Sequence, residues 1–386
     1  MTNLKALLRD FYSDTDIGLS SIARREVAFE AWNGYFNRDN QFNDAETLTS
    51  VLQIRTPKAV FASNAHYLDA AHPDKKKKEI KGVDLAFDFD FTDLPEHDKG
   101  EDFWENIEAI RLHVVRLIEV VLPRLGISKE HVSVSFSGSK GYHVRVLTPA
   151  TFKLTRDQRR QIQEFVAGHS LMDFYVMTPV RSKSGHYKAG WSEKEHGWPG
   201  YISQAAKDYL GAIFEADMAT ATKFVTANLP CYDSGEKKGQ KKKATDKSVT
   251  EIVSLIKDNP DFLKGGRFDS VFKKKNQRTL VVDSIRQFAK TNNACAIDLS
   301  VTQDMRRILR VPGTIHGKTG IPCMPLDIED LGIEVIQDKH KEMVGEDEIE
   351  INLSVPVNTV YGAFDKGTHI LPRYLALCAL CAEANE

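Results

Sequence analysis

The sequence predicts a core of the α+β or α/β class that is interrupted by a helical insert. Short segments in which apolar and polar residues alternate predict strands, and segments with helical periodicity separate them. Residues 155–230 have a mostly helical pattern, and residues 236–247 are rich in lysine with almost nothing apolar. We therefore expect an insert at about 160–260, in which 236–247 forms an exposed loop.

The individual elements follow from local patterns. The helical pattern at 101–125 should end near Pro123 and Gly126, which are typical helix stops. In chain order we expect mostly helix and turn in residues 1–60 with a turn at Asn33-Gly34, a strand at 83–91, a helix at 101–125, a hairpin of two strands at 131–137 and 142–148, and alternating strand and helix at 296–326.

The composition is that of an ordinary globular protein. The chain has 386 residues, of which 41% are hydrophobic and 27% charged, and its formal net charge is -2. This length supports two or three units of domain size and a sizeable core. The charge balance excludes a histone-like basic protein, but it leaves nucleic-acid binding open because charged patches act locally.

Cysteine usage and hydropathy indicate the compartment. An odd number of scattered cysteines in a long chain argues against a disulfide framework, so a reducing compartment is expected. The N-terminus lacks an apolar stretch long enough for a signal peptide, and no run approaches the ~18 apolar residues of a membrane span. We expect a cytoplasmic protein. The cysteines are Cys231, Cys295, Cys323, Cys378 and Cys381.

The first candidate site is the acidic strand at 82–93. Its period of two places Asp84, Asp88 and Asp90 on one face. Carboxylates aligned in this way repel one another, and Mg²⁺ or Mn²⁺ ions would offset the repulsion and could serve a two-metal reaction. The alternative is a solvated edge strand with acidic side chains. A central, buried strand is favoured by the large apolar residues of the other face: Val83, Leu85, Phe87, Phe89 and Phe91.

The second candidate site is the glycine-containing loop of the predicted hairpin. Its two glycines would let backbone N–H groups turn inward as an anion nest. Ser137, Gly138, Lys140 and His143 offer donors that suit phosphate oxygens. The alternative is a plain hairpin whose glycines serve only the turn.

The third candidate site is the cationic segment at 297–320. It begins at Asp298 and continues with Arg306, Arg307 and Arg310, and His316 follows in the next turn. We expect the arginines on a short helix, where they could bind an anionic ligand. The alternative is a solvated helix face.

The end of this segment has some features of a phosphate-binding P-loop. Thr302 is the expected cap of the short helix, which Pro312-Gly313 should end. Gly317-Lys318-Thr319 resembles the end of a P-loop, but only three residues separate Gly313 from Gly317 instead of four. A helix is also expected where a P-loop needs a strand, so the P-loop is excluded.

Taken in order, these motifs resemble those of the archaeo-eukaryotic primase superfamily, and specifically the catalytic small subunit of archaeal DNA primase. The resemblance spans roughly residues 20–330, and the ordered set is far more specific than any single motif. Upstream, Arg25-Glu26-Val27-Ala28-Phe29 resembles the family's Arg-Glu-Phe-x-Phe element, Arg38 followed by Phe42 also matches, and Ser63-Asn64-Ala65-His66-Tyr67 stands where the family has a small-residue and tyrosine segment.

The resemblance implies roles for particular residues. It makes Asp88, Asp90 and Asp298 the catalytic carboxylates that bind two Mg²⁺ or Mn²⁺ ions. It also implies a nucleotide-binding set, in which the last two positions belong to the initiation or nucleotide site: Ser137, Gly138, Lys140, His143, Arg310, His316, Glu26 and Arg38.

The resemblance implies an architecture and partners as well. The expected fold is an α+β primase-type core with mixed or antiparallel sheets flanked by helices. Residues 1–160 and 261–345 would form this core, 161–260 a helical insert, and 346–386 a C-terminal segment packed on the core. The implied partners are a large subunit with an iron–sulfur domain, a single-stranded DNA template, and NTPs or dNTPs.

The function implied is template-directed nucleotidyl transfer that makes short RNA or DNA primers during replication. One alternative is a stand-alone primase-polymerase of the plasmid or end-joining repair type. An alternative of another class is a non-catalytic nucleic-acid-binding assembly subunit. The presence of all three aspartates argues against this last reading, because a degenerate site would usually have lost one.

Two features depart from the family pattern. Residues 92–130 contain no cysteine, and the spacing of His97, His113 and His131 fits no standard zinc site, so no structural zinc is predicted. Cys378 and Cys381 are expected as core residues of an apolar helix. The lysine runs at 74–82 and 236–247 are either solvated loops or contacts to template phosphates, and the first run is the better candidate because it adjoins the acidic strand.

Overall fold

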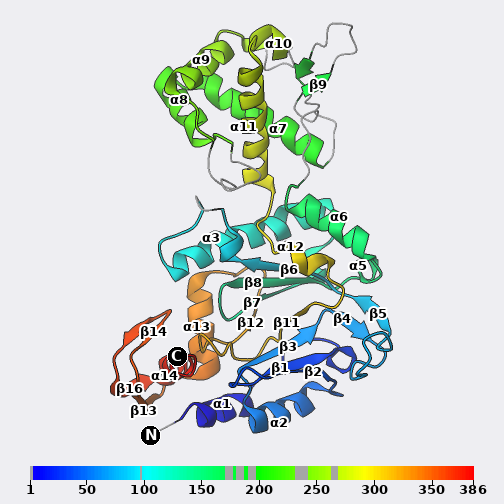
Figure 1. Cartoon of the computed structure of the whole chain (residues 1–386), viewed down its shortest axis with the longest axis vertical. Coiled ribbons are helices and arrows are strands. Elements are labelled where there is room, and N and C mark those ends of the chain that lie inside the picture. Colours follow the sequence, from blue (N-terminus) through cyan, green and yellow to red (C-terminus); the bar gives the residue numbers. More distant parts are fainter. Residues whose placement is uncertain are drawn as a thin grey trace. The chain divides into compact units, whose positions relative to one another are not determined.

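The computed structural model describes residues 3–95, 98–169, 177–179, 187–189, 197–230, 242–261 and 268–386. The chain divides into two compact units (Figure 1). The first comprises Met1–Leu94, Asp98–Gln163 and Ala296–Glu386, and the second comprises Pro95–His97 and Glu164–Cys295. All the candidate site residues belong to the first unit.

The first unit contains a four-stranded antiparallel sheet in the order β11-β3-β1-β2. Helices α1 and α2 lie along it (Figure 1), and their apolar side chains, such as Leu8 and Leu52, share a buried cluster with Val60 and Ala62 of β3. The bounds are α1 Leu4–Ser13, β1 Val27–Glu30, β2 Phe36–Asn40, α2 Ala45–Arg55, β3 Ala59–Ser63 and β11 Ile308–Arg310.

The expectation of mostly helix and turn in residues 1–60 holds for α1, α2 and the turn at Asn33-Gly34, but it missed two strands. These are β1 and β2, which that turn joins. Val27, Ala28 and Phe29 are all buried, so β1 shows no alternation of apolar and polar residues that would identify a strand.

A second four-stranded antiparallel sheet has the order β12-β7-β8-β6. The predicted hairpin is confirmed, since β7 pairs with β8 from Val132↔Val146 to Phe136↔Tyr142. Helix α3 lies along one face of this sheet (Figure 1). The bounds are β6 Leu85–Asp90, α3 Phe103–Arg116, β7 Val132–Phe136, β8 Gly141–Val146 and β12 Met324–Leu326.

The acidic strand β6 is buried, as predicted, but it lies at the edge of this sheet and not in its centre. Its apolar face packs inward, with Phe87 and Phe89 almost fully buried. On the opposite face Ala86 contacts Val301 and Leu309 in a small apolar cluster. This face is therefore covered by a chain segment that comes from more than two hundred residues downstream, which strand periodicity alone does not reveal.

The helix predicted at 101–125 is confirmed. Asp102 caps α3 by accepting a hydrogen bond from the Glu105 N–H. The helix continues through the π turn η3 (Leu117–Val121) and α4 (Leu122–Arg124), and Gly126 follows with a φ of +74°.

The segment at 297–320 folds differently from the expectation. Asp298, not Thr302, caps the short helix α12 (Leu299–Gln303). Arg306 and Arg307 lie in the following turn, and Arg310 belongs to strand β11. A strand thus precedes Gly313 after all, so only the glycine spacing excludes the P-loop.

The C-terminal residues complete the first unit. Leu377 and Leu380 of α14 share the buried cluster of α1 and α2, and Cys378 and Cys381 are buried on the same helix. The other elements of this unit are η1 Ile22–Arg24, β4 Ala65–Tyr67, β5 Ile80–Val83, η2 Phe91–Asp93, η4 Lys129–His131, α5 Pro149–Phe152, α6 Arg156–Val166, α13 Ile333–Val344, β13 Glu348–Leu353, β14 Val357–Thr359, β15 Gly362–Phe364, β16 Gly367–Pro372 and α14 Arg373–Glu383.

The second unit is mostly helical and extends beyond the insert expected at 161–260. Helix α11 belongs to it because Val281, Val282 and Ile285 share one buried cluster with Ile202 and Leu210 of α7. Its elements are β9 Met177–Pro179, β10 Tyr187–Ala189, α7 Trp198–Glu215, α8 Met218–Ala227, α9 Asp246–Lys257, α10 Phe268–Val271 and α11 Lys275–Asn293.

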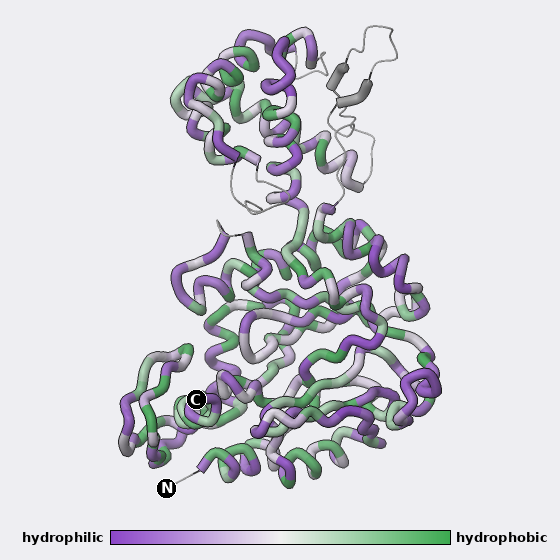
Figure 2. The backbone as a smooth tube through the Cα atoms, viewed as in Figure 1, coloured by the Kyte–Doolittle hydropathy of each residue, from purple (hydrophilic) through white to green (hydrophobic). Residues whose placement is uncertain are grey.

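Several expectations concern residues that the structure describes only in part. Residues 236–241 of the lysine-rich segment, Cys231 and His97 lie outside the described residues. The helices that are described carry hydrophilic and hydrophobic residues along their length (Figure 2), as expected of helices that bury one face. Within the described ranges, no helix is long and apolar enough to cross a membrane.

Candidate active site

Strand β6 and helix α12 bring the three predicted carboxylates into one neighbourhood. Asp88 lies opposite His143 on strand β8, and Asp90 lies opposite Gly141. The Asp298 N–H donates a hydrogen bond of 2.9 Å to the Asp88 carbonyl oxygen, so the start of α12 is fixed beside the edge of β6. Residues 88, 90 and 298 are thus adjacent although the last two are 208 positions apart in the sequence.

The electrostatics of this neighbourhood are unfavourable for carboxylates. Burial and the charges of Asp298 and Asp90 together raise the pKa of Asp88 to about 7, against the opposing effect of Arg307. Burial, followed by Asp298 and Asp90, also raises the pKa of Asp93. Negative charge is therefore concentrated here beyond what the neighbouring arginine offsets.

The donor chemistry of this neighbourhood suits a hard divalent cation, whose preferred ligands are carboxylate oxygens. The oxygens have other partners in the structure: Asp90 Oδ1 accepts hydrogen bonds from Thr92, and Asp298 Oδ1 from the Ser300 N–H. Among the described residues, no three acidic, histidine or cysteine side chains converge closely enough to hold an ion. The charges fit a metal, and the side chains would have to turn toward it.

Asp84 does not belong to this group, although the sequence places it on the same strand face. It is buried, and its carboxylate pairs with Arg25 (Nη2 to Oδ2, 2.6 Å) and His66 (Nε2 to Oδ1, 3.0 Å). Burial alone would raise the pKa of Asp84, but the hydrogen bond from His66 and the charge of Arg25 outweigh burial and lower it. Asp84 is therefore satisfied by the protein itself.

The loop Ser137–Gly141 packs against the loop that carries His316. Gly138 has a φ of +80°, and a Cβ there would lie 2.7 Å from the Ile321 carbonyl oxygen and 2.9 Å from His316 Cβ. Thr319 Oγ1 donates a hydrogen bond of 2.5 Å to the Gly138 carbonyl oxygen. Glycine is required at 138 by both conformation and close approach.

Two backbone N–H groups of the same loop already donate hydrogen bonds within the loop. Ser137 Oγ accepts hydrogen bonds of 3.3 Å from the N–H groups of Ser139 and Gly141. Lys140 is exposed at the tip of the loop, beside Asp90 in the register of the sheet. The loop is thus a preformed turn that presents one lysine next to the carboxylates.

His143, Arg310 and His316 are held in a buried, cationic environment. Burial, followed by the charge of a nearby arginine, lowers the pKa of His143 and of His316 well below the usual histidine value, so both rings are neutral. His143 Nε2 lies 3.6 Å from Asp88 Oδ1. Arg310 lies over the ring of Phe61, with Cζ 4.9 Å from the centroid.

Two buried nitrogen atoms in this group lack hydrogen-bond partners. Within the described part of the chain, neither His143 Nδ1 nor Arg310 Nη1 has one. Because buried polar groups are nearly always paired in folded proteins, such atoms point to water or a ligand in the working enzyme. Oxygen acceptors, such as those of a phosphate, would satisfy the Arg310 nitrogen.

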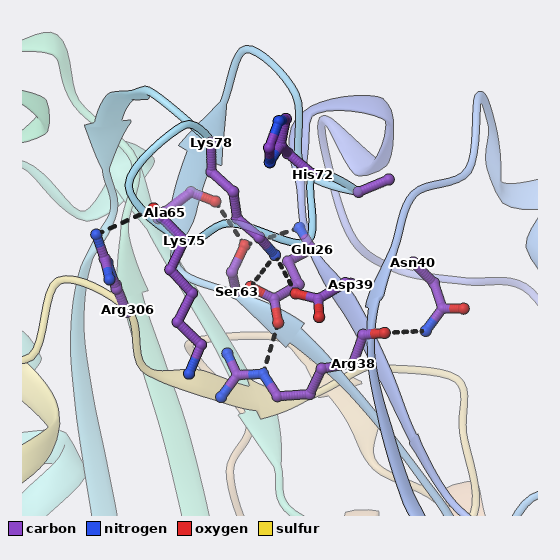
Figure 3. A network of polar contacts seen from close by, with 12 residues as sticks. Glu26, Arg38, Asp39, Asn40, Ser63, Ala65, His72, Lys75, Lys78 and Arg306 are labelled. Carbon is purple, nitrogen blue, oxygen red and sulfur yellow. Dashed lines mark hydrogen bonds and ion pairs between the residues drawn. The ribbon is translucent and has the colours of Figure 1, made fainter.

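Glu26 and Arg38 meet in a buried ion-pair network on the first sheet (Figure 3). Arg38 Nε lies 2.5 Å from Glu26 Oε1, and Lys78 Nζ lies 3.0 Å from Glu26 Oε2. Burial alone would raise the pKa of Glu26, but the hydrogen bonds from Arg38 and Lys78 outweigh burial and lower it. Glu26 is therefore ionised at neutral pH.

Sequence reasoning did not single out Lys78 and placed Arg307 in the wrong element. Lys78 is buried and has no feature that separates it from the three exposed lysines before it. Arg307, whose Nη2 lies 3.3 Å from Asp298 Oδ2, was expected on a helix with Arg310. The strand-forming residues Ile308-Leu309 after Arg307 were the signal that it lies in a turn.

Comparison with known proteins identifies the family. Residues 87–328, which include the acidic strand, the hairpin loop and the segment from Asp298 to His316, match the model of the DNA primase small subunit. The chain belongs to the DNA primase small subunit family. The resemblance to primases that the order of motifs indicated is thereby confirmed, as is the α+β fold with antiparallel sheets.

Curated relatives in this family resemble the chain over most of its length. The DNA primase small subunit PriS of Picrophilus torridus is 26% identical over 371 residues, which cover 92% of this chain and 90% of the relative. The PriS of Methanothrix thermoacetophila is 27% identical over 395 residues, which cover 98% and 96%. The PriS of Methanococcoides burtonii is 25% identical over 402 residues, which cover 99% and 97%.

Family membership gives the enzyme class. The chain is a nucleotidyltransferase of DNA replication that makes RNA primers, as the sequence predicts. The relatives are named DNA primase small subunits, so a stand-alone primase-polymerase and a non-catalytic assembly subunit are not favoured.

Proposed function

We propose that Asp88, Asp90 and Asp298 form the catalytic centre at which this primase joins nucleotides on a single-stranded DNA template. The observation that carries the proposal is the convergence of β6 and α12, which places negative charge beyond what Arg307 offsets next to a cationic loop. Repulsion between like charges destabilises the folded protein, and it is typical of functional sites where a bound ligand offsets it. The proposed ligands are two Mg²⁺ or Mn²⁺ ions held by the three aspartates, with no structural zinc in the chain.

The proposed reaction is an in-line displacement at phosphorus. The 3′-hydroxyl oxygen of the growing primer forms a bond to the α-phosphorus of an NTP, and the bond from that phosphorus to the bridging oxygen breaks. The hydroxyl loses its proton, and pyrophosphate leaves. When bound, the metal ions would stabilise the negative charge on the attacking and leaving oxygens.

The chain's own residues would position the triphosphate. Lys140 at the loop tip, Arg310 with its unpartnered nitrogen and His316 beside Gly138 would bind the phosphate oxygens, together with Ser137 and His143. Such a site works by orientation and charge stabilisation, and no covalent protein intermediate is needed. Glu26 and Arg38, which meet on the first sheet, are proposed for the initiation or nucleotide site.

The proposal also includes a partner subunit, the substrates and a location in the cell. The relatives are named as small subunits, which supports a complex with a large subunit; we propose that this subunit carries the iron–sulfur domain. The proposed substrates are NTPs or dNTPs. A cytoplasmic location is proposed because a primase must meet the DNA that it copies.

Primer synthesis tests the proposed function. Purified protein is incubated with poly-dT, labelled ATP and Mn²⁺, with and without a candidate large subunit. Labelled oligomers are expected from the wild type, and none from the variant Asp88→Asn/Asp90→Asn. Absence of oligomers with and without the large subunit, while DNA is still bound, would favour the non-catalytic assembly subunit.

A further inference from the structure

The loop between β4 and β5 carries four consecutive lysines, and the structure divides them into two groups. Lys78 is buried and points inward (Figure 3), with Nζ 3.0 Å from Glu26 Oε2 and 2.5 Å from Asp39 Oδ1. Lys75, Lys76 and Lys77 are exposed. The run is therefore neither wholly solvated nor wholly buried: one lysine is an anchor for the other three.

The loop is held at further points along its length. Arg306 Nη2 donates a hydrogen bond of 3.2 Å to the Lys75 carbonyl oxygen (Figure 3). Gln41 Oε1 accepts hydrogen bonds from the N–H groups of Ala70 and Ala71, at 3.0 and 3.3 Å. A loop fixed in this way loses little conformational entropy when it binds a ligand.

The exposed cations of the loop and Arg306 form one surface, which we call the basic rim: Lys75, Lys76, Lys77 and Arg306. Among the described residues, the acids of the loop form no ion pair with the rim side chains: Asp74 Oδ1 accepts a hydrogen bond from the Lys76 backbone N–H, and Glu79 pairs with Lys81 at 3.1 Å. Arg306 adjoins Arg307, which pairs with Asp298. The rim is thus joined to the carboxylate neighbourhood and suits a polyanion that passes through it.

The strand register places the basic rim away from Lys140 and Arg310, two of the residues proposed for the triphosphate, whereas the rim's anchor Lys78 pairs with Glu26. Along β11, Ile308 lies opposite Ser63 near the rim, and Arg310 lies opposite Phe61 farther away. At one end of β6, Asp90 lies opposite Gly141 of the Ser137–Gly141 loop. At the other end, Leu85 follows β5, and the loop that carries the rim comes directly before β5. Asp88, with Asp298 beside it, lies between these two ends, and Asp90 lies at the end next to the Ser137–Gly141 loop.

This order indicates which strand would contact the rim. In an in-line displacement the attacking and leaving oxygens lie on opposite sides of the phosphorus. Pyrophosphate leaves toward Lys140 and Arg310, so the strand with the attacking 3′-hydroxyl should extend toward the opposite end. That end carries the basic rim.

We propose that the basic rim binds the phosphate backbone of the growing primer strand, with Lys78 as the positioning residue that anchors it. The proposal rests on the proposed function, because it takes the direction of the strand from the reaction. Removing the rim should weaken the hold on the primer without changing the chemical step. The KM for the primer–template should therefore rise, and the KM for NTP and kcat should not.

Extension of an RNA primer annealed to a DNA template tests the rim with the full chain. The rim variant is Lys75→Ala/Lys76→Ala/Lys77→Ala, and Lys5→Ala/Arg9→Ala/Lys366→Ala is the control, which removes the same charge from the same unit. The rim variant should raise the primer–template KM by on the order of tenfold and lower the slope of log affinity against log salt by about 2. Equal behaviour of the rim variant and the control would overturn the proposal.

Uncharged methylphosphonate linkages identify the strand that the rim contacts. Placed near the primer 3′ end, they should weaken binding to the wild type and leave binding to the rim variant almost unchanged. Placed in the template, they should weaken binding to both proteins equally. If uncharged linkages in the template instead leave the affinity of the rim variant unchanged, the rim binds the template and the proposal is wrong.

Binding measurements separate this proposal from the proposed function. Fluorescence anisotropy with the same labelled duplexes reports the rim even if no nucleotide is added. A wild type that binds duplexes with the expected charge dependence but extends none supports the rim and contradicts the proposed function. A wild type that extends primers while the rim variant retains full affinity contradicts only the rim.

Discussion

The two ends of the acidic strand place the same side chain in opposite situations. Asp84 is buried with Arg25 and His66 as partners, and its pKa is lowered. Four residues later, burial together with Asp298 and Asp90 raises the pKa of Asp88 to about 7. The protein neutralises the first carboxylate with its own cations and leaves the second among further negative charge.

This difference separates a structural acid from a catalytic candidate. Removing one partner of a buried ion pair leaves an unpaired charge and costs stability. Removing one of several repelling carboxylates relieves repulsion and costs function instead. The two kinds of acid share one strand face, so substitution at each position tests the comparison.

The largest expected effect is on stability at the paired end. Asp84→Asn should lower the free energy of unfolding by about 3–5 kcal/mol, because it leaves Arg25 buried without its carboxylate partner. Denaturant unfolding measures this. Asp84→Asn/Arg25→Met should recover part of the loss, and a single variant as stable as the wild type would show that the pair is not structural.

The next effect is on activity at the unpaired end. Asp88→Asn should lower the rate of nucleotide incorporation by on the order of 10²–10³-fold, the usual loss when a group that stabilises a transition state is removed. Its free energy of unfolding should equal or exceed that of the wild type, since repulsion falls. A stable variant with full activity would remove Asp88 from the catalytic centre.

A smaller effect is expected in acid. The pKa of Asp84 in the folded state lies below its ordinary value of about 3.9, so its contribution to stability is present above that pH and is lost as the pH falls through the folded-state pKa. Glu26, whose pKa is also lowered, adds to the same loss. Unfolding free energies measured from pH 6 down to 3 should fall less steeply for Asp84→Asn than for the wild type.

The smallest expected effect is on nucleotide binding at His316. His316→Ala should raise the KM for NTP by roughly tenfold, about 1.4 kcal/mol, because one neutral hydrogen-bonding group of the triphosphate site is lost. The primer–template KM should not change. Steady-state kinetics with each substrate varied in turn gives both values, and an unchanged KM for NTP would place His316 outside the triphosphate site.

The sequence predicted those parts of the site whose pattern is local. Asp88 and Asp90 alternate with buried phenylalanines, and a four-residue loop joins β7 and β8, so strand and hairpin could be recognised directly. The adjacency of Asp298 to this strand came only from the family resemblance.

The parts that could not be predicted depend on distant residues. Asp84 differs from Asp88 because Arg25 lies 59 positions away in the sequence and beside it in the fold. Lys78 differs from its neighbours because its ammonium group pairs with the carboxylates of Glu26 and Asp39. Strand β1 was not recognised because both of its faces are buried, so its residues show no alternation.

Metal binding at the two ends of the strand tests the central claim most directly. Electron paramagnetic resonance titration with Mn²⁺ counts the ions that the chain binds, independently of any primer synthesis. The wild type and Asp84→Asn, at a temperature where both are folded, should bind Mn²⁺ alike, and Asp88→Asn/Asp90→Asn should lose that binding. Equal binding by all three proteins would contradict the assignment of the unpaired carboxylates as the metal site.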